Sequence, residues 1–257
     1  EHKDATLSPK IYVDENPVVQ SEYRHKTKNS YSILDASYNQ GYKKTSEKKT
    51  DGSRNHIFAR SNIDLDLDGF DESKLEINLQ KVSNDTYLKV HNIDSKIMTS
   101  NTVMNSSIEM NFLKNNSSMD INMDVYENLS KADDRYEYVM PNYDYKNKLS
   151  ISDQLGELNF QSRGFYKNYE TNKKQTKLVN DFNWKSEDHV SNSGIITKFE
   201  GNLKNSNYKT KNTSDHKNDK NNFELMGAAS ILSSLPLEKQ SENRKETLTP
   251  KLMLRTA

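Results

Sequence analysis

The feature that most constrains this chain is the alternation of apolar and polar side chains in one segment after another. In one segment Met119, Ile121, Met123 and Val125 alternate with Asp and Asn residues. Successive side chains of a strand point to opposite faces, so such a segment predicts a strand with one apolar and one polar face. A helix would need apolar residues at three- and four-residue spacing, and no long stretch supplies it. The same alternation recurs in residues 57–67, 75–80, 195–203, 223–231 and 248–254.

The connections between the predicted strands differ in length. About thirteen alternating segments can be drawn, which predicts an all-β chain folded as an antiparallel up-and-down meander. Short connections are expected at residues 28–29, 68–71, 114–117 and 147–148, and long polar ones at 43–55, 84–95, 128–135 and 205–221. Short turns at one edge and long loops at the other are typical of outer-membrane barrels.

Many of these segments are longer than the five or six residues usual in soluble sheets. A tilted membrane strand needs roughly 9–11 residues, and a polar face rich in Asp, Lys and Asn suits a wet lumen better than a dry sandwich core. The sequence therefore predicts that residues 1–257 form a single segment of a transmembrane β-barrel, a partial outer-membrane barrel with about 13 of about 26 strands. The lipid-facing residues are expected to include Leu65, Leu67, Ile77, Ile121 and Met123.

The composition argues against several functional classes. The chain has no Cys, and its 37 basic and 37 acidic residues balance, which argues against a thiolate metal site and against a nucleic-acid partner. No phosphate loop, nucleophile elbow or zinc-protease motif occurs. Residues 64–69, D-L-D-L-D-G, imitate the start of a calcium loop, but the twelfth position holds Leu75 in place of a bidentate Glu. We therefore expect no enzyme, no metal and no cofactor.

Two prolines lie in or beside the first two predicted strands. Pro9 belongs to the segment 6–13, and Pro17 begins the segment 17–25. Proline removes a donor from the strand ladder and is confined to edges and bulges. Pro9 and Pro17 are thus candidates for a weakly paired lateral seam; the alternative, that these prolines simply bound the strands, remains open.

Three stretches of the chain resemble one family of outer-membrane proteins. Residues 83–89, S-N-D-T-Y-L-K, are similar to an S-D-D-T-Y-L-R element; residues 54–58, R-N-H-I-F, are similar to R-G-H-I-F; and residues 138–145, Y-V-M-P-N-Y-D-Y, are similar to Y-V-L-P-x-L-D-Y. In this order they resemble the N-terminal half of the barrel domain in the LptD (organic solvent tolerance) family of LPS-assembly proteins, in its alphaproteobacterial form. The matching motif residues are Asp85, Thr86, Tyr87, Leu88 and Pro141.

The resemblance implies a function in the bacterial outer membrane. Members receive lipopolysaccharide (LPS) from a periplasmic LptA-like bridge through an N-terminal jelly-roll domain, which would be missing here together with the closing half of the barrel. They insert the lipid into the outer leaflet through a lateral seam, of which Pro9 and Pro17 look like counterparts, and an LptE-like lipoprotein plugs the lumen. The chain departs from the family in having Asn84 where Asp is usual and in lacking the family's cysteines.

Two alternatives remain open at this point. A porin or receptor barrel would share the alternation but not the ordered motifs. A soluble surface-exposed β-rich adhesin is favoured by the mean hydropathy of −1.03. A signal peptide with an upstream jelly-roll domain in the reading frame would favour the LPS-assembly family, whereas tandem repeats would favour the adhesin.

Overall fold

The structure, a computed structural model, describes residues 2–13, 15–44, 49–152, 155–213, 220–241 and 244–256. Strands make up 72% of it and helix 2%, which confirms the predicted all-β class. No helix in these ranges is both long and apolar enough to cross a membrane.

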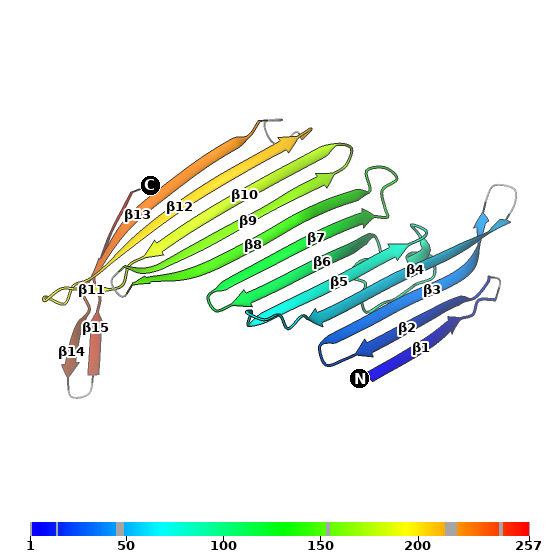
Figure 1. The fold of residues 1–257 in the computed structure, drawn as a ribbon, viewed down its shortest axis with the longest axis horizontal. Coiled ribbons are helices and arrows are strands. Elements are labelled where there is room, and N and C mark those ends of the chain that lie inside the picture. The colour runs from blue at the N-terminus through cyan, green and yellow to red at the C-terminus, as the bar shows by residue number, and fades with distance from the viewer. Residues whose placement is uncertain are drawn as a thin grey trace.

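Most of the strands form one antiparallel sheet in which neighbours in the chain are also neighbours in space (Figure 1). This arrangement confirms the predicted meander. The strands along the sheet are, in order, β1 (His2–Lys10), β2 (Val18–Lys26), β3 (Ser30–Lys44), β4 (Lys49–Asp64), β5 (Glu72–Val82), β6 (Val103–Lys114), β7 (Ser117–Asn128), β8 (Tyr136–Ser152), β9 (Gly156–Tyr169), β10 (Lys173–Lys185), β12 (Ile196–Lys211), β13 (Asn222–Ser234) and β16 (Lys251–Thr256).

Three short strands and one helical turn complete the described structure. β11 (His189–Val190) pairs with β12, and β14 (Leu237–Ser241) pairs with β15 (Arg244–Leu248) in a separate two-stranded sheet. This second hairpin projects from the sheet at one end of β13 (Figure 1). The helical turn is α1 (Tyr87–Val90), in the long connection between β5 and β6.

The sheet is open, because its two outermost strands lie at opposite ends of the strand order (Figure 1). In the described part of the chain β1 pairs only with β2, and β16 pairs only with β13. Nearly all of β1 and all of β16 are exposed. The fold therefore fits a partial, barrel-like sheet with two free edges.

The connections follow the predicted pattern only in part. The long connection 83–102 and the two-residue turn at Asn115 and Asn116 lie at opposite edges, as expected. However, β9 and β10 are joined by a short turn at the edge that carries the long connections, and the β14–β15 hairpin lies at the other edge. The turn predicted at residues 147–148 was wrong, because both residues lie inside β8 and Lys148 Nζ contacts Glu157 Oε1 at 2.6 Å.

The two faces of the sheet differ in chemistry, as the alternation predicted. Cross-strand partners share a face, and the registers join Ile77 to Ile108 and Ile108 to Met123. We call this side the apolar face and the opposite side the polar face. The large side chains of the apolar face are 38–46% exposed, and they include Leu34, Ile57, Ile77, Leu79, Ile108, Met123, Phe182, Leu203 and Ile231.

The buried apolar core lies on the opposite side from these exposed rows. Phe58 and Val82 project from the polar face, since their cross-strand partners are Asp35 and His56. They are covered by Tyr87, Leu88, Ile93 and Ile97, which come from the connection between β5 and β6. The apolar rows of the sheet are thus not packed against one another in this core.

Candidate functional site

The connection between β5 and β6 folds over one end of the polar face. We call residues 83–102 the capping segment. Tyr87 and Leu88 of α1 are 0% and 1% exposed, and they contact a cluster that contains Phe58 and Ile33 of the sheet. Burying a large apolar side chain contributes about 1.5–3 kcal/mol, so a few such residues fix the segment in place.

A buried chain of hydrogen bonds runs beneath the capping segment. The Tyr87 hydroxyl lies 2.8 Å from Ser37 Oγ, which lies 2.5 Å from His56 Nδ1. His56 Nε2 lies 3.2 Å from Asp35 Oδ1. Every group in this chain has a partner when Nε2–H donates to Asp35 and Nδ1 accepts from Ser37. Burial raises the pKa of the Tyr87 phenol and so keeps it a donor.

Ser37, His56 and Asp35 share their residue types with hydrolytic triads, but their surroundings differ. Ser37 is 5% exposed and His56 is 0% exposed, so a substrate carbonyl has no path to the hydroxyl. A nucleophilic serine also needs a position beside it where the reacting atom can sit, and here the Tyr87 hydroxyl occupies the contact with Ser37 Oγ. In this arrangement the three groups hold the capping segment to the sheet.

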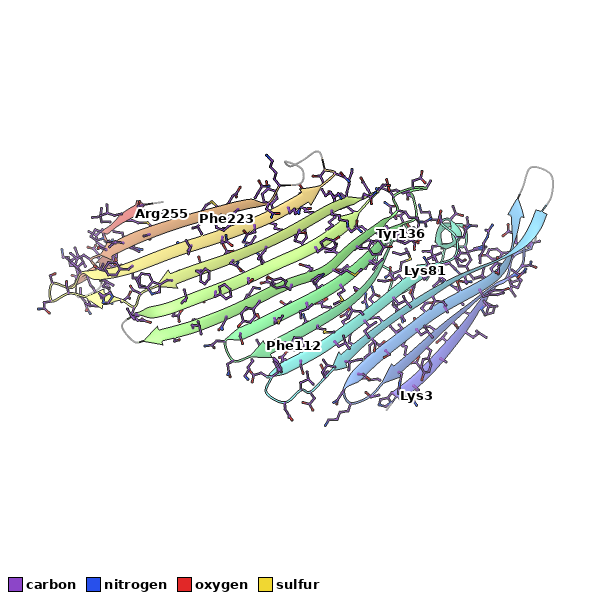
Figure 2. All side chains as sticks on the ribbon, turned by 45° about the horizontal axis from the view of Figure 1, so that its top comes forward. Lys3, Lys81, Phe112, Tyr136, Phe223 and Arg255 are labelled. Atoms are coloured by element: carbon purple, nitrogen blue, oxygen red, sulfur yellow. The ribbon has the colours of Figure 1, made fainter. Side chains whose placement is uncertain are left out.

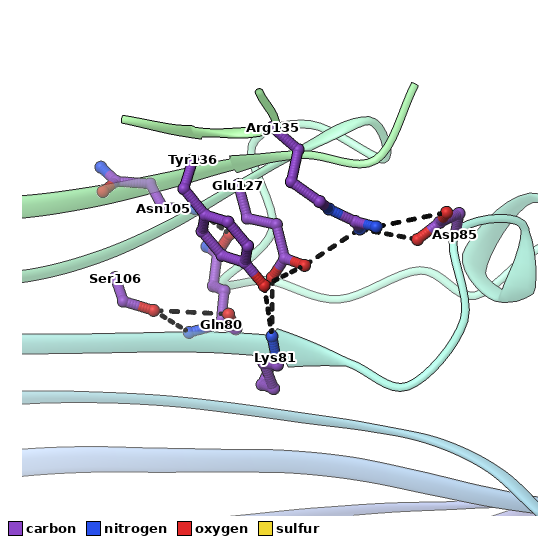
Figure 3. A network of polar contacts seen from close by, with 8 residues as sticks. All are labelled: Gln80, Lys81, Asp85, Asn105, Ser106, Glu127, Arg135 and Tyr136. Carbon is purple, nitrogen blue, oxygen red and sulfur yellow. Dashed lines mark hydrogen bonds and ion pairs between the residues drawn. The ribbon is translucent and has the colours of Figure 1, made fainter. Parts of the chain in front are cut away.

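A second polar network ties the start of the capping segment to the neighbouring strands (Figure 3). Arg135 Nη2 lies 2.7 Å from Asp85 Oδ1 and 2.9 Å from Glu127 Oε1. Glu127 also accepts from Lys81 Nζ and from the Tyr136 hydroxyl, both at 2.8 Å. The side chain of Glu127 is 9% exposed, and a buried carboxylate of this kind is stable only when its oxygens are paired.

The same segment is held from two further sides. Gln80 Nε2 donates to the Ile97 carbonyl at 3.2 Å, and Lys10 Nζ donates to the Asn92 carbonyl at 2.8 Å. The ring of Tyr12 lies 5.8 Å from that of His91. The cap is therefore fixed to β5 and to the end of the first hairpin as well as to β7 and β8.

Beyond the cap, the polar face carries ion pairs and hydrogen bonds that cross between strands. Arg163 Nη2 of β9 contacts Asp181 Oδ2 of β10 at 3.0 Å, and Gln161 Nε2 contacts Asp144 Oδ1 of β8 at 2.8 Å. Figure 2 shows side chains projecting on both sides of the ribbon along its whole length. This face is wettable, while the opposite face presents hydrocarbon.

The structure brings most of the motif residues together at the cap. Asp85 binds Arg135, the Thr86 hydroxyl donates to Asn84 Oδ1, and Tyr87 and Leu88 are buried. Pro141 lies apart, inside β8, where the register to β9 shifts between Val139 and Asn142. A β-bulge of this kind bends a strand locally.

The two seam candidates lie at one end of the first hairpin. Pro9 is inside β1, the outermost strand, opposite Val19 of β2. Pro17 precedes β2, and its carbonyl accepts a hydrogen bond from Asn39 Nδ2 at 3.1 Å.

The five residues expected to face lipid do not share one location. Ile77, Ile121 and Met123 lie on the apolar face of β5 and β7. Leu65 and Leu67 lie beyond the end of β4, in the connection to β5. They therefore belong to the rim of the sheet.

The acidic stretch at the end of β4 borders an open cavity. Within the described residues, no group of three or more His, Cys, Asp or Glu side chains is placed to hold a metal ion. Asp64 and Asp66 instead border an open cavity of ≈ 360 Å³ together with Lys28 and Lys74.

Sequence reasoning missed the polar residues that hold the cap. Asp35, Ser37 and His56 belong to the polar face by parity, and so resemble its solvated neighbours in sequence. The one available signal is the position of His56 inside the R-N-H-I-F stretch. Arg135 and Glu127 carry no such signal, because Arg135 pairs with Asp85 across 50 residues of the chain and Glu127 pairs with Lys81 across 46.

No protein-family model matches this chain, and no curated protein matches it.

Proposed function

We propose that this chain forms part of an outer-membrane β-barrel that takes lipopolysaccharide from the periplasm and releases it into the outer leaflet through a lateral seam. The observation that carries the membrane assignment is the exposure of the apolar face, where large hydrophobic side chains stand in rows without a covering layer. Soluble monomers rarely expose a contiguous apolar surface of this extent. Hydrocarbon is the solvent that suits it, while the polar face suits water.

The proposed cargo follows from the chemistry of the two faces. LPS joins a polar sugar head to apolar acyl chains, and carrying the head unassisted through hydrocarbon would be prohibitive. A polar face rich in paired charges can solvate the head, and an edge strand such as β1 can part from its neighbour to let the chains pass. Pro9 in that edge strand lacks a ladder donor, which supports a weakly paired seam there.

The proposed partners follow from the family resemblance. The motif residues Asp85 to Leu88 lie in the capping segment on the polar face, where a plug lipoprotein of the LptE type would also sit. A periplasmic bridge of the LptA type would hand over the lipid before it reaches the barrel. No step in this transfer needs a catalytic group or a bound cofactor.

The membrane assignment can be tested with single cysteines, because the chain contains none. Met123→Cys and Asn122→Cys place a bimane label on neighbouring residues of β7 that point to opposite faces. In liposomes, the label at 123 should be quenched by brominated lipid and the label at 122 by aqueous iodide. Equal iodide quenching at both positions would favour the soluble adhesin.

The cargo needs a separate experiment in the host cell. On depletion of the protein, newly made LPS should no longer reach the cell surface, as measured by pulse labelling. Normal surface LPS in a strain whose protein passes the liposome test would instead indicate a porin or a receptor.

A further inference from the structure

A small cavity on the polar face lies far from the capping segment, over β8, β9, β10 and β12. It has a volume of ≈ 290 Å³, and Arg163, Lys177 and Lys204 contribute to its lining. The registers explain this convergence, since Val179 of β10 lies opposite both Arg163 of β9 and Ser206 of β12. The basic side chains therefore reach toward one point from three adjacent strands.

The floor of this cavity is apolar although it belongs to the polar face. Val179 is 4% exposed, and Phe165 stands beside it opposite Lys177. Longer side chains shield the valine from water. A ligand seated here would find hydrocarbon below its carbon body and cations around it, a combination typical of small-molecule sites.

The charges of the cavity are not balanced. Its lining contains no carboxylate, and the adjacent Asp181 contacts both Arg163 at 3.0 Å and Lys204 at 3.7 Å. Among the described residues, Asp181 is thus the one carboxylate in ion-pair contact with any of these three basic side chains. Within the residues that the structure describes, the side-chain ammonium of Lys177 makes no hydrogen bond or ion pair, and it remains available to a ligand.

The other carboxylates on this face do not neutralise the positive charge of the cavity. Asp144 lies opposite Arg163 in the register, but its carboxylate contacts Gln161 Nε2 at 2.8 Å and Lys146 Nζ at 3.3 Å. Glu224 lies opposite Ser206 on β13, at the outer side of the cavity, and forms no ion pair among the described residues. The cavity therefore keeps a net positive charge.

We propose that this cavity, lined by Arg163, Lys177 and Lys204 over Val179, binds a phosphomonoester carried on a carbon body. A guanidinium presents two parallel donors that match phosphate oxygens, and lysine adds point charges. A phosphomonoester carries about −1.5 to −2 at neutral pH, which matches the excess of cations. The proposal does not depend on the proposed function, because a free phosphosugar and a lipid headgroup would both present a phosphomonoester to this cavity.

The test is a titration of the full chain, folded in detergent micelles, with glucose 6-phosphate as the probe and glucose as the uncharged control. Wild type should bind glucose 6-phosphate and not glucose, and added salt should weaken the binding. Lys177→Gln should weaken it about tenfold or more, since the variant loses a charged hydrogen-bond donor to the phosphate. Each variant is used after circular dichroism has verified its β-sheet content.

Lys174→Gln is the matched control, because Lys174 lies on the same strand but points to the opposite face. This substitution removes the same charge as Lys177→Gln. Its affinity should equal that of wild type. Equal weakening by both variants, or no binding to the folded wild type, would overturn the proposal. Competition by phosphatidylcholine vesicles containing phosphatidic acid would support the site and identify a lipid headgroup as the source, whereas binding that such vesicles leave unchanged would support it with a free phosphomonoester.

Discussion

Asp85 in the capping segment accepts hydrogen bonds from Arg135, which directly precedes β8, across 50 residues of sequence. The same guanidinium reaches Glu127 at the end of β7. One side chain thus joins the cap to two neighbouring strands (Figure 3). The motif that suggested a family in the sequence is therefore also the point at which the long connection is fastened to the sheet.

Removing the Arg135 guanidinium should loosen the cap more than removing the charge of Asp85. Arg135→Gln deprives the mostly buried Glu127 of one partner and Asp85 of its only ion pair among the described residues. We expect the free energy of local opening to fall by about 1–3 kcal/mol. Asp85→Asn leaves Arg135 paired with Glu127, and should cost less.

Hydrogen exchange at the amide of Ile93, which donates to the Leu88 carbonyl, measures this opening. Lys131→Gln is the control, since Lys131 approaches Glu170 only at 3.8 Å on the surface. Unchanged protection in Arg135→Gln would mean that the apolar contacts alone hold the cap.

The apolar contacts of the cap can be tested within one helical turn. Leu88→Ala removes a side chain that is 1% exposed, and should lower the free energy of unfolding by about 2–5 kcal/mol. Val90→Ala changes a residue that is 58% exposed in the same turn. This substitution should change the free energy of unfolding by less than about 0.5 kcal/mol. Denaturant titration of both variants in detergent provides the comparison, and equal losses would place Leu88 outside the core.

The cap should also respond to pH through His91. Burial lowers the pKa of this imidazole below its ordinary 6.5, and Nε2 has no hydrogen-bond partner in the described part of the chain. Lys10, Tyr12, Glu15, Arg54 and Tyr87 surround it. The folded state therefore favours the neutral ring, while the opened state binds a proton more readily.

The sign of the effect follows from this difference. Between the lowered pKa and 6.5 the opened cap binds more protons, so the stability of the closed cap is complete above about pH 6.5 and declines as the pH falls below it. Exchange at Ile93 should accelerate relative to the intrinsic rate over this range. His91→Gln should flatten that dependence, whereas His189→Gln, at an exposed position, should leave it intact. If the pH dependence of exchange at Ile93 were unchanged in His91→Gln, another titrating group would be responsible for it.

The strands and their faces could be predicted from the sequence, because parity is a local property. Ile77, Ile121 and Met123 lie on one face as the alternation indicated. Leu65 and Leu67 continue the same alternation, but the chain leaves β4 at Asp64 and turns at Asp66, whose φ is 51°. An alternating pattern does not by itself mark where pairing stops, since the turn residues here are also polar.

The cap could not be predicted, because its position depends on contacts between distant segments. Residues 84–95 look like a polar loop in sequence. Tyr87, Leu88, Ile93 and Ile97 show neither strand nor long helical periodicity, and they acquire a common face only when they fold onto Phe58. The turn predicted at residues 147–148 was wrong for a related reason. A sheet face that contacts water can carry polar and charged residues in the middle of a strand, as β8 does here.

The proposed environment of the apolar face leads to a stability difference between adjacent residues. Met123→Lys places a charge among Ile108 and the other apolar rows in the middle of β7. In lipid this should cost about 2–4 kcal/mol if the position is near the midplane. Asn122→Lys changes the polar face and should have a much smaller effect. Urea titration in liposomes measures both, and equal costs would contradict the assignment of lipid to one face.

The last prediction concerns a glycine on which an aromatic ring lies. Gly164 of β9 is opposite Tyr143 of β8, and a Cβ added there would lie 2.9 Å from the Lys177 carbonyl and 3.0 Å from the Tyr143 ring. The backbone oxygen belongs to the β9–β10 ladder and cannot move without loss of pairing. Gly164→Ala should therefore lower the free energy of unfolding by about 1–3 kcal/mol, the usual cost of overpacking.

Gly227→Ala supplies the control, since a Cβ there meets its nearest atoms at an ordinary 3.7 Å on the equally extended β13. It should be neutral or slightly stabilising, because alanine restricts the unfolded chain more than glycine does. A neutral Gly164→Ala would contradict the close approach of the Lys177 carbonyl and the Tyr143 ring to this glycine. The cavity over Val179 depends on the register of β9 and β10, so a destabilised Gly164→Ala should also bind a phosphomonoester more weakly.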